Sequence, residues 1–460
     1  VAHQLKRLNH AIKLIKPALI LGGGLKSTTQ KALFLYRRDG LKGIHHGFKR
    51  IAVSTQNKPS VAEHPIFQKA STHLAQHTLQ PSILIIAEMS IPQCTKYRVI
   101  QKQKMFQSLG FKCTVCNWTD YRLCLSEIST HSIAIFYRVP ALPVALKLIK
   151  EAKRLKITTF WEVDDLIFDR EVLEGSRTLA QLDRSVYKGL IDGAVSYKEA
   201  MLSCDKGIAS TVELANEMHN AGLNEVFVVE NALDQQTLTH AKKINLSSHN
   251  PGDGFIRLVY GSGTNTHNID FEEASVALLS ILKSFPKVKL RIIGRLELIG
   301  EFSCFKSQIE RIPFCSYEEY LHHLAECDIN IAPLENYIFN ESKSNIKFLE
   351  ASILKVSSIC SPRSAFSQAI THGENAFLCD TEEDWFEALQ LLVSDNTLRK
   401  RMALSAYKSV LSDYSPSTIA EKQLLPLVTQ HHAKPKNKTR VLVVNLFYSP
   451  QSFGGATIVA

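Results

Sequence analysis

The sequence predicts an α/β protein built from two doubly wound parallel sheets, and two observations lead to this prediction. Short apolar runs, such as residues 83–87, alternate with longer stretches of helical periodicity. That alternation is typical of parallel strands that are buried on both faces and joined by helices. It is interrupted by a polar, turn-forming stretch at residues 245–254 and then starts again. We therefore expect two similar units with a boundary there.

The first unit begins at the run 83–87, which is the buried type of parallel strand. Gly110 follows the first helical stretch and is a suitable C-cap. Further strands are predicted at 112–118, 132–139, 158–164, 206–210 and 225–230, and helices at 97–109, 142–155, 178–204 and 212–221. Strands and helices that alternate in this way indicate a doubly wound sheet.

The second unit repeats the pattern after residue 254. Strands are predicted at 256–260, 288–293, 328–333, 357–360 and 376–380, and helices at 271–285, 317–326, 383–393 and 397–411, with one more helix ending near 354. A chain of 460 residues is long enough for two or three domains. We divide it into a basic helical leader and linker (1–80), two Rossmann-like domains (81–245 and 246–430) and a last segment (431–460).

The positive charge of the chain is concentrated at its start. Residues 1–80 hold thirteen Lys or Arg but only two acidic residues, Asp39 and Glu63, a balance of +11 against +10 for the whole chain. Apolar and basic residues interleave at 5–20, which predicts either an interfacial helix on an anionic membrane or a solvated linker. No nucleic-acid recognition motif accompanies the charge, so we expect no nucleic-acid partner.

Cysteine usage and hydropathy favour a cytoplasmic protein, with peripheral contact at the inner face of the cell membrane through residues 1–80 as the membrane alternative. Ten cysteines are scattered, and the pair Cys113 and Cys116 lies in a strand-like run without a partner pair. We therefore expect core thiols in a reducing compartment and no metal site. No apolar stretch reaches the ~18–20 residues that a spanning helix needs, and no signal-peptide pattern opens the chain.

A polar loop at 339–350 separates a buried strand from a helix, which makes it a natural anion site. Free backbone N–H groups and the helix dipole meet there. Lys343 and Lys347 strengthen the prediction of a phosphate ligand, and Glu350, about two turns further on, can accept hydrogen bonds from sugar hydroxyls. Phosphate and ribose together indicate a nucleotide.

Small residues follow two other strands of the second unit. The run from Gly261 and Ser262 through Gly263 to His267 lets a ligand approach the backbone closely, and a tight turn is the structural alternative. Gly294 ends the next strand, and Arg295 after it is a candidate partner for a diphosphate.

Charged residues also end strands of the first unit. Asp164 and Asp165 close one strand and Arg138 another, and such residues face the crevice in which open α/β sheets bind ligands. Helix capping is the alternative role for the two carboxylates. Arg98 belongs to the loop region after the first strand.

The run Phe339-Asn340-x-x-Lys343-Ser344-x-Ile346-Lys347-x-Leu349-Glu350 resembles the donor-site motif of retaining glycosyltransferases with the GT-B fold, of the family 4 type (glycosyl transferases group 1). In that family a second glutamate binds the nucleotide ribose, and Glu350 matches it. A first glutamate touches the transferred sugar. Its position here is Ser342, with Glu341 one residue out of register.

The resemblance implies two Rossmann-like domains that face each other across a cleft, with the acceptor on the side of 81–245 and the nucleotide sugar on the side of 246–430. The final strand-like run and its glycines resemble the opening of another GT-B transferase, so we expect 431–460 to be a linker and the truncated start of a further domain of a multidomain chain.

The implied activity is a glycosyltransferase, hexosyltransferase-like (EC 2.4), that moves a sugar from a nucleoside-diphosphate sugar to a glycan or lipid-linked acceptor in polysaccharide biosynthesis of the cell envelope. It would need no permanently bound cofactor and no metal. The alternatives are a non-catalytic glycan-binding or scaffold module, and a nucleotide-sugar epimerase of the same fold. The expected catalytic residues are Asp164, Asp165 and Lys343; the acceptor-side residues are Arg98 and Arg138; the donor-binding residues are Gly261, Ser262, Gly263, His267, Gly294, Arg295, Asn340, Ser342, Ser344, Asn345, Ile346, Lys347 and Glu350.

Overall fold

The computed structural model describes residues 81–180, 182–246, 252–262, 268–298 and 300–429, together with Thr29 and Leu33. Apart from those two positions, the predicted leader 1–80 lies outside the described residues, as do the segment 431–460, Gly263 and His267. Among the helices of the described ranges, none is both long and apolar enough to cross a bilayer.

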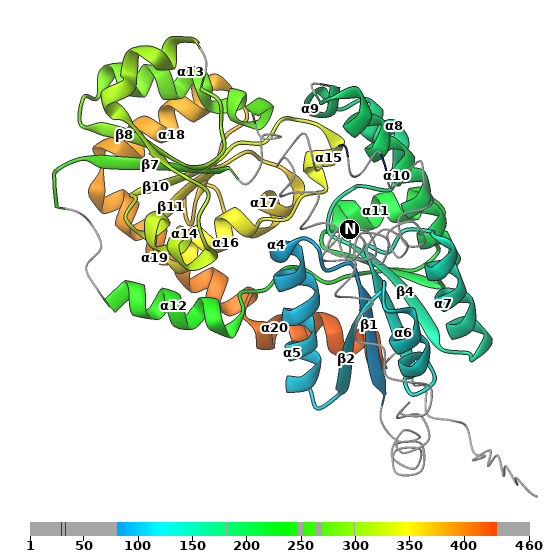
Figure 1. Cartoon of the computed structure of the whole chain (residues 1–460). Helices are drawn as coiled ribbons and strands as arrows, with labels where there is room; N and C mark the ends of the chain where they lie inside the picture. The colour runs from blue at the N-terminus through cyan, green and yellow to red at the C-terminus, as the bar shows by residue number, and fades with distance from the viewer. Residues whose placement is uncertain are drawn as a thin grey trace, which may run out of the picture.

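The first lobe is a six-stranded parallel sheet with helices on both faces (Figure 1). Its strands lie in the order β2-β1-β3-β4-β5-β6. They are β1 (Ser82–Ala87), β2 (Lys112–Asn117), β3 (Ile133–Tyr137), β4 (Thr158–Val163), β5 (Lys206–Ala209) and β6 (Val226–Val228). The helices are α4 (Pro92–Cys94), the π-helix η2 (Thr95–Ile100), α5 (Gln101–Ser108), α6 (Tyr121–Ile128), α7 (Pro143–Arg154), α8 (Arg170–Glu174), α9 (Arg177–Ala180), α10 (Arg184–Ser203) and α11 (Val212–Asn220). The next helix, α12 (Gln235–Leu246), packs against the second lobe.

The alternation of side chains along β1 explains why this strand is apolar throughout. Ile83 and Ile85 point into one buried cluster, and Leu84 and Ile86 point into the cluster on the opposite face. Successive side chains of a strand face opposite sides of the sheet, so a strand covered on both sides by helices must be apolar at every position.

The second lobe repeats this design with the strand order β12-β11-β10-β7-β8-β9, and its pairings are likewise parallel. Its strands are β7 (Ile256–Ser262), β8 (Val288–Gly294), β9 (Ile309–Ile312), β10 (Ile329–Ala332), β11 (Ser357–Cys360) and β12 (Phe377–Leu378). Its helices are α13 (Asn268–Ser284), the 3-10 helix η4 (Gly300–Gln308), α14 (Tyr317–Ala325), α15 (Ile338–Glu341), α16 (Ile346–Ile353), α17 (Ser364–Ala369), α18 (Glu382–Ser394) and α19 (Asn396–Asp413).

These two sheets confirm the predicted α/β class with two doubly wound units. The periodicity also located most elements within a few residues. It missed β9 and the helices α4, α6, α8, α12, η4, α15 and α17, and it gave no indication that η2 is a π-helix.

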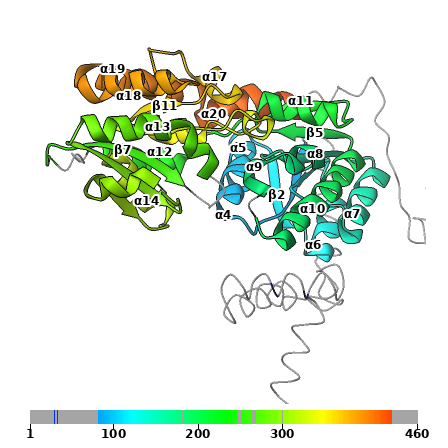
Figure 2. The ribbon, with the colours of Figure 1, turned by 90° about the horizontal axis from the view of Figure 1, so that it is seen from above.

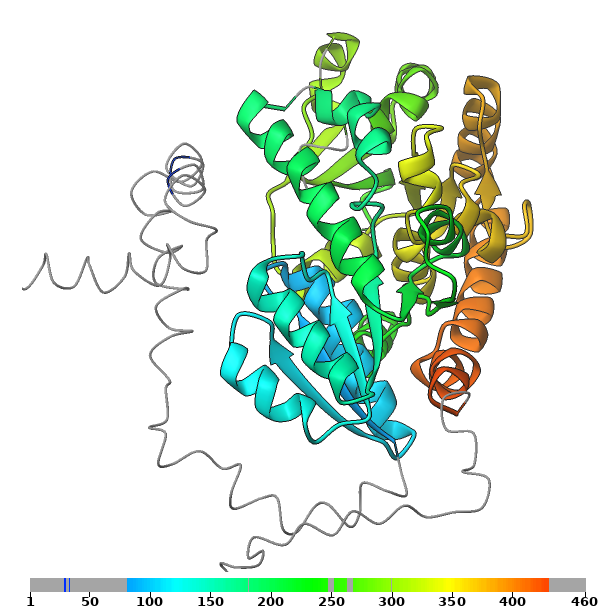
Figure 3. The ribbon, with the colours of Figure 1, turned by 90° about the vertical axis from the view of Figure 1, so that its right-hand side faces the viewer.

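The chain returns to the first lobe at its described end. After α19 it forms α20 (Pro416–Ile419), the π-helix η5 (Ala420–Leu424) and α21 (Leu425–Thr429). Figure 2 shows α19, α17 and α20 in succession along one side of both lobes, and Figure 3 shows the orange and red helices descending beside the first lobe. There α20 and η5 pack against α5. Residues 416–429 were predicted to belong to the second unit, but their apolar face is buried against the first lobe.

Candidate active site

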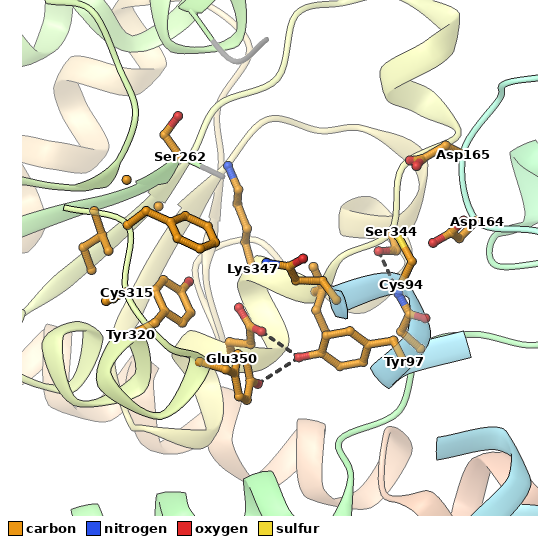
Figure 4. A pocket seen from close by; sticks show the side chains of 18 residues that line it. Cys94, Tyr97, Asp164, Asp165, Ser262, Cys315, Tyr320, Ser344, Lys347 and Glu350 are labelled. Atoms are coloured by element: carbon orange, nitrogen blue, oxygen red, sulfur yellow. Dashed lines mark hydrogen bonds between the residues drawn. The ribbon is translucent and has the colours of Figure 1, made fainter. Parts of the chain in front are cut away.

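A cavity of about 450 Å³ lies between the two lobes, and both contribute to its wall (Figure 4). Many lining residues follow the carboxyl ends of strands, which is where open α/β sheets bind ligands. From the first lobe they are Gln93, Cys94, Tyr97, Asp164, Asp165 and Asn231; from the second they are Gly261, Ser262, Ile293, Gly294, Phe314, Cys315, Tyr317, Tyr320, Ser344, Ile346, Lys347 and Glu350.

The N-terminus of α16 opens at this cavity. Its N-cap residue, Asn345, gives the helix no side-chain cap. The Asn345 amide donates to the Ala365 carbonyl oxygen and the Tyr414 hydroxyl. Ser344 and Ile346, on either side of the cap, both line the cavity. The positive end of the helix dipole is therefore presented to any anion that enters.

Lys347 adds a full positive charge to this helix end. Its Nζ is buried and has no hydrogen-bond partner among the described residues, and it lies 4.5 Å from the centroid of the Tyr260 ring. Burial lowers the pKa of Lys347 to about 8, partly offset by the charge of Asp270. In Figure 4 the side chain extends into the cavity toward Ser262. A buried ammonium without a partner is costly, so an anion bound beside it would be stabilised strongly.

Glu350 lies on the same helix and is surrounded by phenols. Tyr97 of the first lobe donates to its Oε1 at 2.7 Å, and the Tyr97 and Tyr317 hydroxyls are 2.8 Å apart. Burial raises the pKa of Glu350, against the hydrogen bond from Tyr97, the nearby hydroxyls of Tyr317 and Tyr320 and the charge of Lys96, which all favour the ionised form. The carboxylate is therefore held in place by both lobes and still lines the cavity.

Asp164 and Asp165 form the opposite wall, where Arg138 holds both. The Arg138 Nε donates to Asp164 Oδ1 at 2.5 Å, and its other arm donates to Asp165. Arg138 has a φ of +50°, an unfavourable value that this double ion pair fixes. Burial raises the pKa of Asp164, but the charges of Arg138 and Arg98 outweigh it, so the pKa falls. The pKa of Asp165 is raised by burial and by the Asp164 charge despite Arg138.

Arg98 is close to the site but not in the cavity wall. It is buried in the first lobe, where it forms an ion pair with Glu162 and donates to the Val229 carbonyl oxygen and to Asn231 Oδ1. Lys102 shares the same carboxylate, and burial lowers the pKa of Lys102 to about 8. Arg98 therefore reaches the cavity only through Asn231, which lines it.

Three predicted residues of the donor loop turn away from the cavity. Lys343 forms an ion pair with Asp270 at 3.3 Å, and Asn340 donates to the same carboxylate at 2.8 Å. The Ser342 hydroxyl donates to the Ile338 carbonyl oxygen. These contacts fix the path of the loop into α16, while Lys347 is the lysine that lines the cavity.

Neither residue at the register of the family's first glutamate lines the cavity. Ser342 is fully buried. The Glu341 carboxylate accepts from the Arg363 guanidinium at 3.3 Å and from the Ser364 backbone N–H at 2.7 Å, so it stabilises the start of α17.

The remaining predicted donor residues divide between the cavity and the surface. Gly261, Ser262 and Gly294 line the cavity. Arg295 is exposed and outside the wall, and its backbone carbonyl accepts from the Ser262 hydroxyl at 2.5 Å. Gly263 and His267 lie outside the described residues.

Gly294 is a position where we expect substitution to be costly. Its φ is +100°, and a Cβ there would lie 1.8 Å from the Ser262 carbonyl oxygen. Gly294→Ala should lower the free energy of unfolding by at least about 2 kcal/mol, measured by urea denaturation. Gly110→Ala is the control, because Gly110 has a φ of +86° but nothing within 4 Å of a Cβ. Equal losses in the two variants would contradict the steric argument.

Sequence reasoning missed much of the aromatic wall. Phe314, Tyr317 and Tyr320 follow β9, a strand that the periodicity did not predict. Asn231 is not among the predicted site residues, yet its amide donates to the Ser344 hydroxyl across the lobes at 3.0 Å. The spacing Tyr317-x-x-Tyr320 places both rings on one helix face and was the available indication. In the described ranges, no group of three or more His, Cys, Asp or Glu residues is placed to hold a metal ion.

Comparisons with known proteins agree with this architecture. Residues 247–409 match the family model described as Glycosyl transferases group 1, and no curated protein matches the chain. The HepE protein of Anabaena, solved with UDP and glucose, aligns with a TM-score of 0.52 at 12% identity, over 76% of this chain and 100% of that one. The sucrose-phosphate synthase of Thermosynechococcus elongatus aligns with a TM-score of 0.51 at 11% identity, over 77% of this chain and 99% of that one.

A UDP-forming α,α-trehalose-phosphate synthase from Burkholderia xenovorans aligns with a TM-score of 0.50 at 9% identity, over 76% of this chain and 100% of that one. At such identities the alignments concern the fold. They confirm the predicted GT-B architecture, and the assignment to family 4 within it stays a prediction. Residues 247–409 are therefore similar to the glycosyl transferases group 1 family, in a chain whose two lobes together form the GT-B fold.

Proposed function

We propose that this chain is a glycosyltransferase that moves a sugar from a nucleoside-diphosphate sugar to a hydroxyl of a glycan or lipid-linked acceptor. The observation that carries the proposal is Lys347, a cavity-lining lysine whose buried Nζ has no hydrogen-bond partner among the described residues. A diphosphate would supply the missing negative charge. The uncapped N-terminus of α16 lies next to it and favours the same ligand.

The nucleotide would lie along α16. Glu350, on the same helix, is placed to accept hydrogen bonds from the ribose hydroxyls, as the second glutamate does in the family that the loop resembles. Gly261 and Gly294 would let the donor approach the backbone closely. HepE was solved with UDP and glucose and the trehalose-phosphate synthase is UDP-forming, which supports a UDP-sugar as the first donor to test.

The acceptor would enter from the first lobe. Asp164 and Asp165 face the cavity there, and their carboxylates can accept hydrogen bonds from sugar hydroxyls while Arg138 balances their charge. Stabilisation of the departing diphosphate by Lys347 and the helix end would provide most of the catalysis. We infer retention of the anomeric configuration, with the departing phosphate assisting the acceptor hydroxyl.

A donor screen followed by a transfer assay tests this function. The full chain is mixed with UDP-, GDP- and dTDP-sugars, and its melting temperature is measured. A matching donor at about 100 times its Kd should stabilise the chain by about 2.7 kcal/mol. NMR of the product from that donor and a glycan acceptor should show the donor's anomeric configuration. A chain that no donor stabilises would contradict the proposal, and conversion of the donor without acceptor would favour an epimerase.

A further inference from the structure

A π-helix lies between the first lobe and the cavity. η2 (Thr95–Ile100) joins α4 to α5, and π-turns of this kind are uncommon and recur at functional sites. Three consecutive side chains of η2 point in two directions. Lys96 and Tyr97 reach toward the second lobe, while Arg98 turns into the core of the first.

Tyr97 spans the cavity between the lobes. Its hydroxyl donates to Glu350 Oε1 at 2.7 Å, so the contact at 2.8 Å between the Tyr97 and Tyr317 hydroxyls must have Tyr317 as its donor. The Tyr97 and Tyr317 rings also meet edge to face, with centroids 6.4 Å apart. Figure 4 shows the Tyr97 ring projecting from its helix toward Glu350. A residue of the first lobe thus holds the carboxylate proposed for the ribose.

Lys96 anchors the same helix at the connection between the lobes. Its Nζ lies 3.3 Å from Asp234 Oδ2, 3.0 Å from the Thr237 hydroxyl and 3.3 Å from the centroid of the Tyr317 ring. Asp234 immediately precedes α12, which leads to the second lobe. Lys96 therefore ties the helix that carries Tyr97 to the start of α12. This connection must bend when the lobes move relative to each other.

The loop before α16 is fastened to the first lobe as well. The Thr211 hydroxyl donates to the Ser342 carbonyl oxygen at 2.9 Å, and the Tyr337 hydroxyl donates to the Val172 carbonyl oxygen at 2.6 Å. Together with Tyr97 these bonds join the two lobes at both ends of the proposed donor site. Separation of the lobes would break them in one event.

Glu350 keeps room for a ligand despite this contact. An ionised carboxylate offers about four acceptor positions, and the Tyr97 hydroxyl takes one of them. A ribose hydroxyl can therefore bind Glu350 without displacing Tyr97. Each bond would help to fix the carboxylate for the other, so the two contacts reinforce rather than compete.

We propose that Tyr97 is a positioning residue that orients Glu350 for the donor ribose and thereby couples nucleotide binding to closure of the two lobes. The proposal rests on the nucleotide-sugar function above and adds a residue and a movement to it. Its consequence is that the nucleotide binds most tightly to the arrangement of the lobes in which Tyr97 contacts Glu350.

The test compares Tyr97→Phe with the wild-type chain and with Tyr407→Phe, a control on α19 outside the cavity wall. UDP is the probe, or the nucleoside diphosphate that the donor screen selects. Calorimetry measures its Kd from pH 4.5 to 7.5, and X-ray scattering measures the radius of gyration with and without it. Circular dichroism verifies that each variant is folded.

We expect Tyr97→Phe to raise the Kd about 5- to 10-fold near pH 7 and to reduce the nucleotide-induced decrease in radius. The acid limb of binding, which is the pH range in which the Kd rises as the pH falls, should also move to higher pH. The loss of a hydrogen bond to the charged form raises the pKa of Glu350, so the ionised carboxylate is lost earlier as the pH falls. The other groups that face Glu350, namely Lys96, Lys347, Tyr317 and Tyr320, are unchanged in this variant.

Tyr317→Phe provides a second variant, because it leaves the bond from Tyr97 to Glu350 in place and should have a smaller effect on the acid limb. An unchanged Kd, acid limb and radius in Tyr97→Phe would overturn the positioning role while leaving the proposed function intact. A wild-type chain that binds no nucleoside diphosphate would overturn both.

Discussion

Lys347→Met should lower kcat/KM for sugar transfer by at least about 100-fold while making the folded chain more stable. The first effect follows because the ammonium is the charge proposed to stabilise the departing diphosphate, and one such donor is typically worth about 10²–10³ in rate. The second follows because its buried Nζ has no hydrogen-bond partner among the described residues, so a methionine of similar length removes a desolvation cost of about 1 kcal/mol or more.

The matched control is Lys355→Met, which removes the same charge from an exposed position just after α16. This variant should leave kcat/KM for sugar transfer and the free energy of unfolding nearly unchanged. Initial-rate kinetics and urea denaturation measure the two quantities. If Lys347→Met were active and less stable than the wild type, Lys347 would be a structural residue and the diphosphate site would have to lie elsewhere.

The pH dependence of donor binding should follow the ionisation of Lys347. Burial lowers the pKa of Lys347 to about 8, against about 10.4 for a lysine in an unfolded chain. Donor affinity should therefore fall as the pH rises above about 8, because the ammonium that pairs with the diphosphate is lost. Folding stability should rise between about pH 8 and 10.4, because the unfolded chain binds the extra proton there. Calorimetry should show no such fall of affinity in Lys347→Met. Denaturation should show a smaller rise of stability in that variant, because Lys102, whose pKa burial also lowers to about 8, still contributes.

Glu350→Gln should weaken nucleotide binding by roughly 10- to 100-fold, the second large effect that we expect. Hydrogen bonds from ribose hydroxyls to an ionised carboxylate are worth about 1.5–3 kcal/mol each, and the neutral amide weakens them without changing the shape of the side chain. Titration calorimetry with UDP measures the loss directly.

Glu341→Gln is the comparison that decides the register of the donor loop. Its carboxylate is bound to Arg363 and to the Ser364 backbone N–H, away from the cavity. This variant should lower stability by about 0.5–2 kcal/mol, through a weaker helix start, and leave nucleotide affinity within about twofold. If calorimetry gave equal losses of affinity for Glu341→Gln and Glu350→Gln, the assignment of Glu350 to the ribose would be wrong.

The sequence predicted the sheets well because each buried strand must be apolar on both faces. The run 83–87 is apolar at every position for that reason. The sequence also placed Lys347 and Glu350 together, since positions three apart share a helix face. Both line the cavity.

The contacts between the lobes could not be predicted, because they depend on how distant segments meet. No feature of the local sequence distinguishes Lys343 from Lys347. Asp270 on α13 nevertheless forms an ion pair with Lys343, whereas Lys347 lines the cavity. Arg98 is charged but buried, because it forms an ion pair with Glu162 on β4. The π-helix that presents Tyr97 has only 6 residues, which is too short for a periodicity to show in the sequence.

The return of the chain from the second lobe to the first has a consequence for biosynthesis. Leu233, just before α12, donates its backbone N–H to the Tyr414 carbonyl oxygen at 2.9 Å, so the outgoing and returning connections run side by side. Leu424 and Leu427 then complete the buried cluster beneath α5. During translation, the core of the first lobe can close only after residues 419–428 have been made, well after the rest of that lobe. A nascent chain stopped near residue 246 would therefore expose an apolar face and be a substrate for chaperones.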